Sequence, residues 1–289
     1  MQQKTVTYYQ QKVNDVLNYI NNHLDENLNT KALAEKFCIS FYHFHRIFKA
    51  VLNEPLGSYI KRVRLETATK LIRYSNEQLS DIALRIGYND LSSFSKAFSK
   101  EFGISPNEYK ENNNIVLNTH IDYTINTAGK LIFDLKPKII DVPGKNVACI
   151  TVIGQYGGEE TLSAWDNLGR FALQNKISGW KPEVFALYYD DPDLVGLKNC
   201  KSDICITAKK KFIPCENIVN KYIEGGRFAV FRYKGPYELL WDLYYSIYRN
   251  WVLTTDVKLR DLPMIEKYIV YSPSTKPENL LTEVYIPIE

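Results

Sequence analysis

The residues of this chain that most often perform chemistry, its histidines and cysteines, are too dispersed to form a catalytic or metal-binding motif. Only His43 and His45 lie close together, and no cysteine is near enough to complete a zinc-binding pattern. The five cysteines have no CxxC spacing, so we expect mostly buried, reduced thiols. The sequence shows no Ser-His-Asp set and no phosphate-binding loop. We therefore expect no enzyme activity, no cofactor and no metal site.

Two short segments, 41–49 and 91–100, carry polar and basic side chains at helical spacing. One face of each is apolar, and we expect residues such as Phe44 and Phe94 to face a core. The other face suits nucleic acid, because an arginine fork matches guanine N7 and O6 and other polar groups can contact phosphates. Arg46 is the best candidate for direct base readout. The candidate DNA-contacting residues are Ser40, Phe41, Tyr42, His45, Arg46, Lys49, Leu91, Ser92, Ser93, Ser95, Lys96 and Lys100.

The secondary structure predicted from the sequence is helical in the first third of the chain, which holds these residues, and mostly extended beyond it. A length of 289 residues predicts two domains, and 45% hydrophobic with 24% charged residues is an ordinary globular balance. A polar run at 111–114 ends the helical part, and β-branched and aromatic stretches such as 147–156 and 226–233 follow it. We place a first domain at 1–112, a linker at 113–136 and a second domain at 137–289.

Charge and hydropathy exclude a membrane protein and say little about nucleic acid. No apolar run reaches the roughly 18 residues of a membrane helix, and the N-terminus lacks the apolar segment of a secretory signal. The net charge of +3 is too small to indicate nucleic acid by itself, although residues 1–114 hold the excess, with 15 Lys+Arg against 12 Asp+Glu. We expect a cytoplasmic protein with no membrane partner.

The first domain contains an internal repeat. Gly87 repeats Cys38 at an offset of 49, and Phe94 repeats Phe44 at an offset of 50. Each copy is predicted to form a short helix, a tight turn and a second helix, and a long helix over about 56–74 joins the two copies. The predicted N-caps are Asn29 or Thr30 and Ser40 in the first copy, and Ser80 and Asp90 in the second.

Two helix-turn-helix units on one linking helix resemble the DNA-binding domain of the AraC/XylS family of transcription regulators. The motifs that carry the resemblance are A-x4-IS-x3-FHRIFK at 34–49, PLGxYIxxxRLxxA at 55–68 and IAxxIGYxDxSxFSKxFxKxxGxSPxxY at 82–109. Cys38 departs from the family, in which a glycine is common at that turn, and a cysteine in a left-handed turn costs energy. The resemblance implies double-stranded DNA as a partner, with RNA polymerase as a further candidate.

The second domain contains a fainter repeat. The pairs Trp165-Asp166 and Trp241-Asp242 lie 76 residues apart, each in a predicted helix (159–176 and 236–252) that follows a long strand. Two β-α-β-β modules would then occupy 137–213 and 217–289. The predicted fold class is therefore multidomain: an all-α double helix-turn-helix domain followed by an α+β domain of two β-α-β-β modules.

This layout resembles the GyrI-like effector-binding fold. The resemblance rests on Arg232-Tyr-Lys-Gly-Pro-Tyr237, the duplication and a terminal Glu-x-x-x-Pro strand. It implies a small-molecule effector in an aromatic-lined cleft with one acidic residue inside, and Glu283 matches the family's position for that acid. The candidate ligand-binding residues are Glu283, Tyr285, Trp165, Tyr188, Tyr237, Trp241 and Tyr245.

The residue pattern of the last strand bears on the same site. Alternation places Glu283 and Tyr285 on one face of the strand and its aliphatic residues on the other. A carboxylate among aromatic rings suits an organic cation, which gains from charge pairing and from cation–π attraction. In the alternative interpretation, the aromatic residues are ordinary core and Glu283 faces solvent. If Glu283 is not in the site, Glu266 or Glu238 is the candidate acid.

The sequence as a whole predicts a sequence-specific DNA-binding transcription regulator whose second domain binds an aromatic or cationic small molecule. Two other functions stay open. The first is a small-molecule hydrolase, because some GyrI-like domains are known as hydrolases and Glu283 with a tyrosine could activate water. The second is an architectural DNA-binding protein without ligand control. Turnover of candidate compounds would favour the hydrolase, and a ligand-insensitive footprint would favour the architectural protein.

Overall fold

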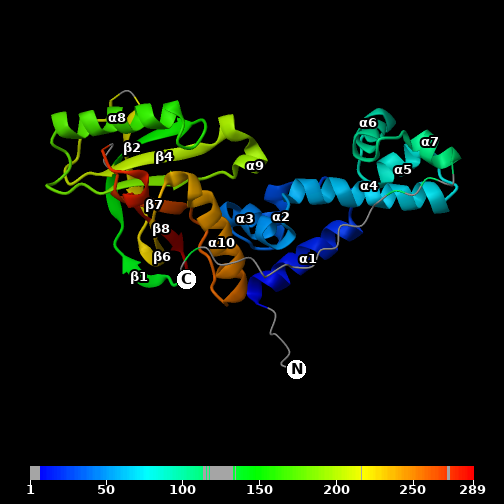
Figure 1. Cartoon of the computed structure of the whole chain (residues 1–289), viewed down its shortest axis with the longest axis horizontal. Helices are drawn as coiled ribbons and strands as arrows, with labels where there is room; N and C mark the ends of the chain where they lie inside the picture. The colour runs from blue at the N-terminus through cyan, green and yellow to red at the C-terminus, as the bar shows by residue number, and fades with distance from the viewer. Residues whose placement is uncertain are drawn as a thin grey trace. The chain divides into compact units, whose positions relative to one another are not determined.

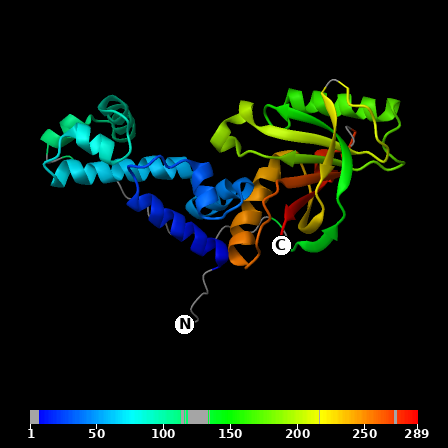
Figure 2. The same ribbon diagram turned by 180° about the vertical axis from the view of Figure 1, so that it is seen from behind.

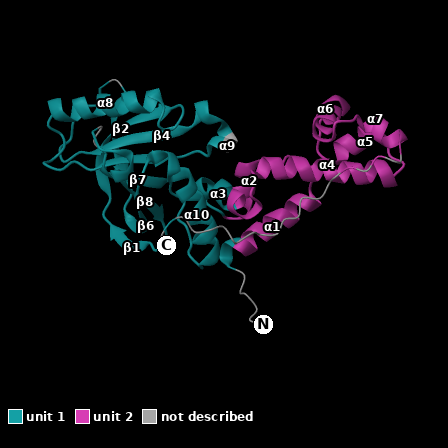
Figure 3. Cartoon of the chain, in the orientation of Figure 1, with its two compact units in different colours: residues 1–9, 39–47, 129–289 teal, residues 10–38, 48–128 magenta. Residues whose placement is uncertain are grey.

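The chain divides by its residue contacts into two compact units, which are described separately. Unit 1 comprises residues 1–9, 39–47 and 129–289, and unit 2 comprises residues 10–38 and 48–128 (Figure 3). The structure, a computed structural model, describes residues 7–112, 115, 117, 133, 135–215, 217–271 and 274–289, without the side chains of 193 and 194. Most of the predicted linker at 113–136 lies outside the described residues.

The first 112 residues are helical where the structure describes them, as predicted. The helices are α1 (Tyr8–Asn22), α2 (Thr30–Lys36), α3 (Phe41–Leu52), α4 (Leu56–Tyr74), α5 (Leu79–Arg85), α6 (Leu91–Phe102) and α7 (Pro106–Glu111). The pairs α2–α3 and α5–α6 are the two predicted helix-turn-helix units, and α4 confirms the predicted linking helix. The first seven residues of α3 belong to unit 1 and the remaining five to unit 2.

Side-chain caps define the starts of α2, α6 and α7. The carboxamide oxygen of Asn29 accepts from the backbone N–H of Lys31 at 2.8 Å and caps α2. Asp90 accepts from the backbone N–H of Ser93 at 2.7 Å and caps α6, as predicted. The prediction that Ser80 caps α5 is wrong, because the N-cap is Gln78 and Ser80 already lies inside the first turn.

The turn of each helix-turn-helix unit requires a left-handed residue. Gly87 has a φ of 83°, and Cys38, at the equivalent position of the first copy, has a φ of 51°. Only glycine takes this conformation without steric cost, so the first turn keeps its shape at the expense of about 1–2 kcal/mol of local strain. The departure from glycine noted in the sequence therefore leaves the turn geometry intact.

Phenylalanines at helical spacing build the core of unit 2. Phe94 and Phe98 of α6 are fully buried, pack edge to face at 5.6 Å, and contact Ile82 of α5 and Leu65 of α4. Burying one such side chain contributes roughly 1.5–3 kcal/mol, so these rings hold α6 on α4 and α5 by its apolar face. The other face of α6 is left to carry the candidate DNA-contacting residues.

Unit 1 contains one eight-stranded antiparallel sheet in the order β1-β6-β8-β7-β3-β4-β2-β5. The strands are β1 (Lys138–Val142), β2 (Lys145–Ile153), β3 (Val184–Tyr188), β4 (Lys201–Thr207), β5 (Ile218–Ile223), β6 (Gly226–Lys234), β7 (Met264–Val270) and β8 (Leu281–Pro287). If β1, β2, β3 and β4 are exchanged with β5, β6, β7 and β8, respectively, the same order is obtained in reverse. This is the strand order expected of two modules related by a pseudo-twofold axis. The predicted duplication is confirmed.

Each module contains one strand more than predicted. Two strands that do not pair with each other precede each long helix, so the modules are β1-β2-α8-β3-β4 and β5-β6-α10-β7-β8, where α8 is Glu159–Gln174 and α10 is Leu240–Asn250. The extra strands pair across the modules, β1 with β6 and β5 with β2. Because each module lends an edge strand to the other, neither can complete its backbone hydrogen bonds alone.

The two faces of the sheet bury different clusters. On one face, α8 runs along β2 and β4, and Leu168 packs against Ala148 and Ile204 (Figures 1 and 2). On the other face, Phe185 and Phe228 belong to a second cluster. The short helix α9 (Pro192–Val195) lies between β3 and β4 in the chain. Among the described residues, no helix is both long and apolar enough to cross a bilayer.

Candidate functional site

The outer face of α6 presents most of the predicted DNA-contacting residues of the second copy to solvent. Ser92, Ser93 and Lys96 are exposed, and Lys100 is exposed in the last helical turn. Leu91 is 42% exposed at the start of the helix, and Ser95 is half-buried. This helix therefore has an open polar face of the kind that enters a major groove or lies against phosphates.

The first candidate reading helix, α3, differs sharply. His45 and Arg46 are only 6% and 7% exposed, so the expected outward position of both side chains is wrong in this structure. Phe41 is 37% exposed, whereas Tyr42 and Lys49 are half-buried. Amphipathic spacing correctly identified the apolar side of the helix but could not show that its polar side is covered as well.

The cover of α3 comes from residues of the second domain that belong to the same compact unit, unit 1. The ring nitrogen Nδ1 of His43 lies 2.6 Å from the hydroxyl of Tyr248 on α10, with both side chains buried. Arg46 Nη2 donates to the backbone oxygen of Asp190 at 3.4 Å. The face that covers α3 thus comes from α10 and from the segment after β3.

Two further contacts extend this face. The ring of Tyr42 lies 6.0 Å from that of Tyr189. The hydroxyl of Ser40 donates to Asp261 at 2.8 Å, so it contacts the second domain. We call the surface formed by Tyr189, Asp190, Tyr248 and Asp261 the docking face.

A buried carboxylate lies on the face of the sheet that α8 covers. Glu266 of β7 is directly opposite Ala186 of β3, and Ala186 belongs to the core beneath α8. Only 3% of Glu266 is exposed. The hydroxyl of Tyr268 donates to its Oε2 at 2.6 Å, and the hydroxyl of Tyr188 lies 2.9 Å from that of Tyr268. Two tyrosine hydroxyls in series therefore reach the carboxylate.

Aromatic rings from both modules surround this carboxylate. Trp165 of α8 packs edge to face on Tyr268 at 5.5 Å, and Tyr237, just before α10, does the same from 5.6 Å. Tyr156, after β2, packs on Tyr188 at 4.5 Å and stacks with Trp241 of α10 at 6.2 Å. We call the set the acidic aromatic site. It consists of Glu266, Tyr156, Trp165, Tyr188, Tyr237, Trp241 and Tyr268.

The acidic aromatic site has an acid without a cation. Burial raises the pKa of Glu266 from 4.5 to about 7, and the hydroxyls of Tyr268 and Tyr188 only partly offset it. In the described part of the chain, no basic side chain pairs with Glu266. A shift of this size means that ionising the buried acid costs about 3 kcal/mol more than in water. A bound organic cation would supply the missing charge.

The structure does not bring Glu283 to these rings, which corrects the predicted site. Glu283 of β8 is directly opposite Lys267 and Arg232. Because Glu266 is the neighbour of Lys267 on β7, Glu266 and Glu283 lie on opposite faces of the sheet. The hydroxyl of Tyr285 donates to Glu283 at 3.0 Å, and the Tyr285 ring packs in the cluster of Phe185. The prediction that Glu283 and Tyr285 share one face of the strand is confirmed, but the acidic aromatic site lies on the opposite face of the sheet.

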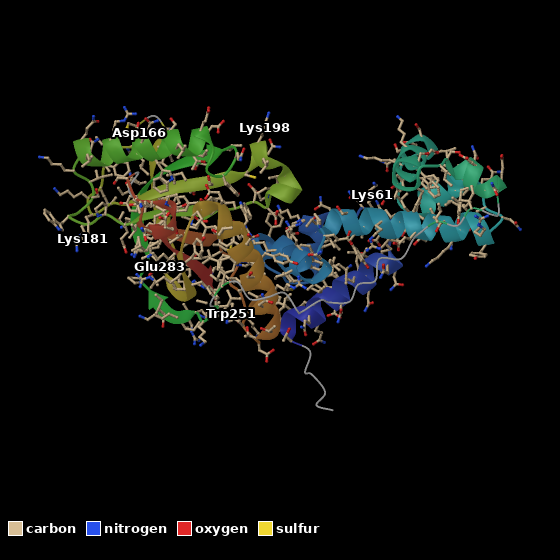
Figure 4. The ribbon with its side chains drawn as sticks, viewed as in Figure 1. Lys61, Asp166, Lys181, Lys198, Trp251 and Glu283 are labelled. Atoms are coloured by element: carbon tan, nitrogen blue, oxygen red, sulfur yellow. The ribbon has the colours of Figure 1, made fainter. Side chains whose placement is uncertain are left out.

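Four of the predicted ligand-binding residues do meet: Trp165, Tyr188, Tyr237 and Trp241. Tyr245 lies on α10, where its hydroxyl accepts from Arg249 at 2.9 Å. Asp166, the partner of Trp165 in the repeated Trp-Asp pair, projects from the outer side of α8 and pairs with Arg170 (Figure 4).

Sequence reasoning placed Glu283 ahead of Glu266 as the acid and missed Tyr156 and Tyr268. A signal was present in the strand 264–270, because Met264, Glu266 and Tyr268 alternate on one face and a charged residue between two large apolar ones is unusual there. A hollow of about 500 Å³ beside Trp251 lies elsewhere. It is a shallow, open surface hollow, and we do not assign it a ligand.

Two families of known domains match the chain, each over a different part of it. Residues 135–289 match the family of the GyrI-like small molecule binding domain, and residues 33–112 match a helix-turn-helix domain family. Regulatory protein SoxS from Salmonella typhimurium is 32% identical over 102 residues, which cover 35% of this chain and 95% of SoxS. The similarity to SoxS is limited to one third of the chain.

Two further relatives extend over the second domain. Transcriptional regulator Rob from Salmonella typhimurium is 22% identical over 299 residues, covering 96% of this chain and 97% of Rob. The solved structure of a hydrolase from Listeria innocua is 14% identical, with a TM-score of 0.42, over 55% of this chain and 94% of the hydrolase. The match to Rob shows the same order of the two parts along a whole chain.

Proposed function

Because this chain belongs to the GyrI-like small molecule binding domain family and carries an AraC-type helix-turn-helix region, we propose that it regulates transcription in response to an aromatic organic cation. The chain is a DNA-binding transcription regulator with a small-molecule binding domain. The chemical class of the effector and the residues that bind it are our proposal. One observation carries it: Glu266 is buried among aromatic rings, and no basic side chain of the described residues pairs with it.

The DNA half of the proposal rests on α6 and α3. Lys96 and Lys100 are positioned to neutralise phosphates, and Ser92 and Ser93 lie at the N-terminal end of α6, where recognition helices approach base edges. On α3 we retain Arg46 as the base reader, to be exposed when the helix binds DNA. DNA is the proposed macromolecular partner, and RNA polymerase is a further partner that we propose on the resemblance alone.

The effector half rests on charge and shape. An aromatic cation that separated Tyr156 from Trp241 would keep stacking contacts on both of its faces and would bring its charge toward Glu266. The rings are packed against one another without the ligand, so entry requires Trp241, which is 43% exposed, to move. This favours planar or small cations over bulky neutral compounds.

The experiment compares two isosteric ligands with two acid variants. (4-Hydroxyphenyl)trimethylammonium and 4-tert-butylphenol differ in one central atom and in charge, and both can be titrated by calorimetry. In the Glu266→Gln variant the cation should bind at least tenfold more weakly, and the phenol should change less than twofold. In the matched Glu283→Gln variant, the affinity for neither ligand should change. Equal losses for both ligands in Glu266→Gln, or a cation-specific loss in Glu283→Gln, would overturn the assignment.

A regulator also needs an operator. Selection of duplexes from a random library by the full chain, followed by footprinting, should yield one preferred sequence. Enrichment of no sequence would favour an architectural DNA-binding protein.

The curated relatives described above are regulators, and we propose that this chain acts in the cytoplasm, where its DNA lies, and without enzymatic turnover. Hydrolysis of a bound ester or amide would contradict the last point.

A further inference from the structure

Three consecutive residues at the end of β3 serve two surfaces. The ring of Tyr188 belongs to the acidic aromatic site, the ring of Tyr189 contacts Tyr42 of α3, and the backbone oxygen of Asp190 accepts from Arg46. Successive residues of a strand point to opposite sides, so a displacement of this strand end moves both surfaces together. The acidic aromatic site and the docking face thus contain adjacent residues of the chain.

A hydrogen-bonded tyrosine adds a second connection. The ring of Tyr156 is a wall of the acidic aromatic site, while its hydroxyl donates to the backbone oxygen of Asp190 at 3.1 Å and to that of Lys201 at 2.9 Å. The same hydroxyl accepts from the backbone N–H of Asp190 at 3.0 Å. Tyr156 therefore fixes the residue whose carbonyl holds Arg46.

Helix α10 makes the third connection. Trp241 lies in the acidic aromatic site, packs edge to face on Tyr244 at 5.8 Å, and is followed two turns later by Tyr248, which contacts His43. Residues at this spacing share one side of a helix. A ligand that displaces Trp241 acts on the helix that carries the main buried partner of α3.

We propose that the docking face is an intramolecular binding site for the first recognition helix, and that a ligand in the acidic aromatic site releases that helix for DNA. Docking and base reading exclude each other, because Arg46 and Tyr42 cannot contact Asp190 and Tyr189 while facing a major groove. The free chain would then contact DNA through α6 alone. The ligand half of this inference rests on the proposed function, and the docking half does not.

Linkage fixes the direction of the effect. A ligand that separates Tyr156 from Trp241 binds the undocked state better, so it increases the affinity for DNA, and DNA must increase the affinity for the ligand by the same factor. An activating effector is therefore expected. A factor of about 5–150 is typical of such coupling.

The docking half is tested by hydrogen–deuterium exchange of the full chain at the amides of residues 41–47. Tyr248→Phe removes the hydroxyl that contacts His43 and keeps the ring, so exchange should accelerate roughly tenfold. Ser40→Ala, which removes the partner of Asp261 at a less buried position, should act in the same direction. Tyr222→Phe removes an exposed hydroxyl on β5 and should leave exchange unchanged. A 30-base-pair duplex of random sequence, titrated by anisotropy, should bind the first two variants several-fold more tightly.

The ligand half is tested with Tyr156→Phe and the probe (4-hydroxyphenyl)trimethylammonium. In the wild type, saturating probe should accelerate exchange at 41–47 and tighten duplex binding. Tyr156→Phe removes the hydroxyl that fixes Asp190, so exchange at 41–47 should already be fast without the probe, and the probe should accelerate it little further.

Distinct results would overturn each half. Folded Tyr248→Phe and Ser40→Ala proteins that exchange at 41–47 like the wild type would refute docking. A probe that binds the wild type without changing exchange would refute the coupling while leaving the proposed function intact. If the probe does not bind the wild type, the proposed function and the coupling fall together, and the Tyr248→Phe result alone decides docking.

Discussion

The hydroxyl of Tyr268 donates to the carboxylate of Glu266 at 2.6 Å, two residues apart on the same face of β7. A strand that carries both donor and acceptor on one face can satisfy part of a buried charge by itself. It cannot neutralise that charge, and burial still raises the pKa of Glu266 to about 7. The free site therefore sits close to its midpoint of ionisation near neutral pH, so small changes of pH alter its charge.

Cation binding should follow this ionisation. A cation needs the carboxylate, whereas protonated Glu266 dominates below about pH 7. The affinity for (4-hydroxyphenyl)trimethylammonium should fall about tenfold between pH 8 and pH 6, as the free site takes up a proton that the bound site does not. Calorimetry at both pH values in buffers of different ionisation enthalpy would measure the affinity and the protons released.

Two controls isolate Glu266 in this measurement. The tyrosines around it have raised pKa values and stay neutral throughout this range. The phenol isostere should bind almost equally at pH 8 and pH 6, and the Glu266→Gln variant should show no pH dependence for either ligand. A pH-dependent cation affinity that survives Glu266→Gln would show that another group controls the site.

Arg46 and Lys100 should affect DNA binding differently. Arg46→Ala should weaken binding to the selected operator by about 1–3 kcal/mol and relax one base preference, because it removes a base contact. It also removes the contact with Asp190, so its affinity for random duplex should rise. Lys100→Ala should weaken binding to all DNA sequences alike. It should also reduce the salt slope, which is the change of log K with log salt concentration, by about 0.9.

A matched lysine variant gives the baseline for these titrations. Lys70→Ala removes the same charge from the exposed side of α4 and should leave the salt slope unchanged if α4 does not contact phosphates. Anisotropy titrations at several salt concentrations measure the affinities and the salt slope, and footprints at fixed salt measure the base preference. If Arg46→Ala retained operator affinity and preference, α3 would not read bases.

The left-handed cysteine predicts a stabilising substitution. Cys38→Gly should raise the free energy of unfolding by about 0.5–1 kcal/mol, because the relief of left-handed strain exceeds the entropy that glycine adds to the unfolded chain. Urea unfolding of the full chain measures this. Cys38→Ala is the control, since it removes the thiol but keeps the strained Cβ, and it should be close to the wild type.

The equivalent glycine predicts the opposite result. A Cβ on Gly87 would lie 2.2 Å from the backbone oxygen of Leu24 and 2.4 Å from the guanidinium of Arg64. That guanidinium donates to Leu24 and to Glu26, so it cannot move away freely. Gly87→Ala should cost about 2 kcal/mol or more. If Gly87→Ala left the free energy of unfolding unchanged, this turn would be able to accommodate a Cβ without a loss of stability.

Acid should loosen the docking of α3. Burial, with a smaller contribution from Arg46, lowers the pKa of His43 from 6.5 to about 3. The undocked helix can bind a proton below pH 6.5 that the docked helix cannot bind until about pH 3. Docking is therefore fully stable above pH 6.5 and weakens as the pH falls, by about 2 kcal/mol between pH 7 and pH 5. Exchange at 41–47, corrected for the intrinsic rate, should accelerate about thirtyfold.

The groups around His43 allow this effect to be assigned. It faces Arg46 on its own helix, Tyr248 on α10 and the backbone of Arg260 and Leu262, and Asp261 lies in that last segment. Arginine and tyrosine do not titrate between pH 5 and pH 7. In His43→Gln the pH dependence should disappear. Persistence of the dependence in that variant would shift the assignment to Asp261 or to Glu266.

Local patterns in the sequence determined much of this protein. Helical spacing predicted α4 over 56–74 and the burial of Phe94 and Phe98, because a single helix face must reach the core. Alternation correctly placed Glu283 and Tyr285 on one face of β8, since neighbouring residues of a strand must point apart. Those constraints act within one element, so one sequence is enough to read them.

Only the tertiary structure decided which face of the sheet α8 covers and which polar groups meet there. Alternation shows which residues of a strand share a face but not which face of the sheet that is, so it could not favour Glu266 over Glu283. The register of β7 with β3 places Glu266 on the face that α8 covers. The polar side of α3 likewise gave no sign of its burial. Its partner Tyr248 is 205 residues away, and no local pattern encodes a contact at that distance.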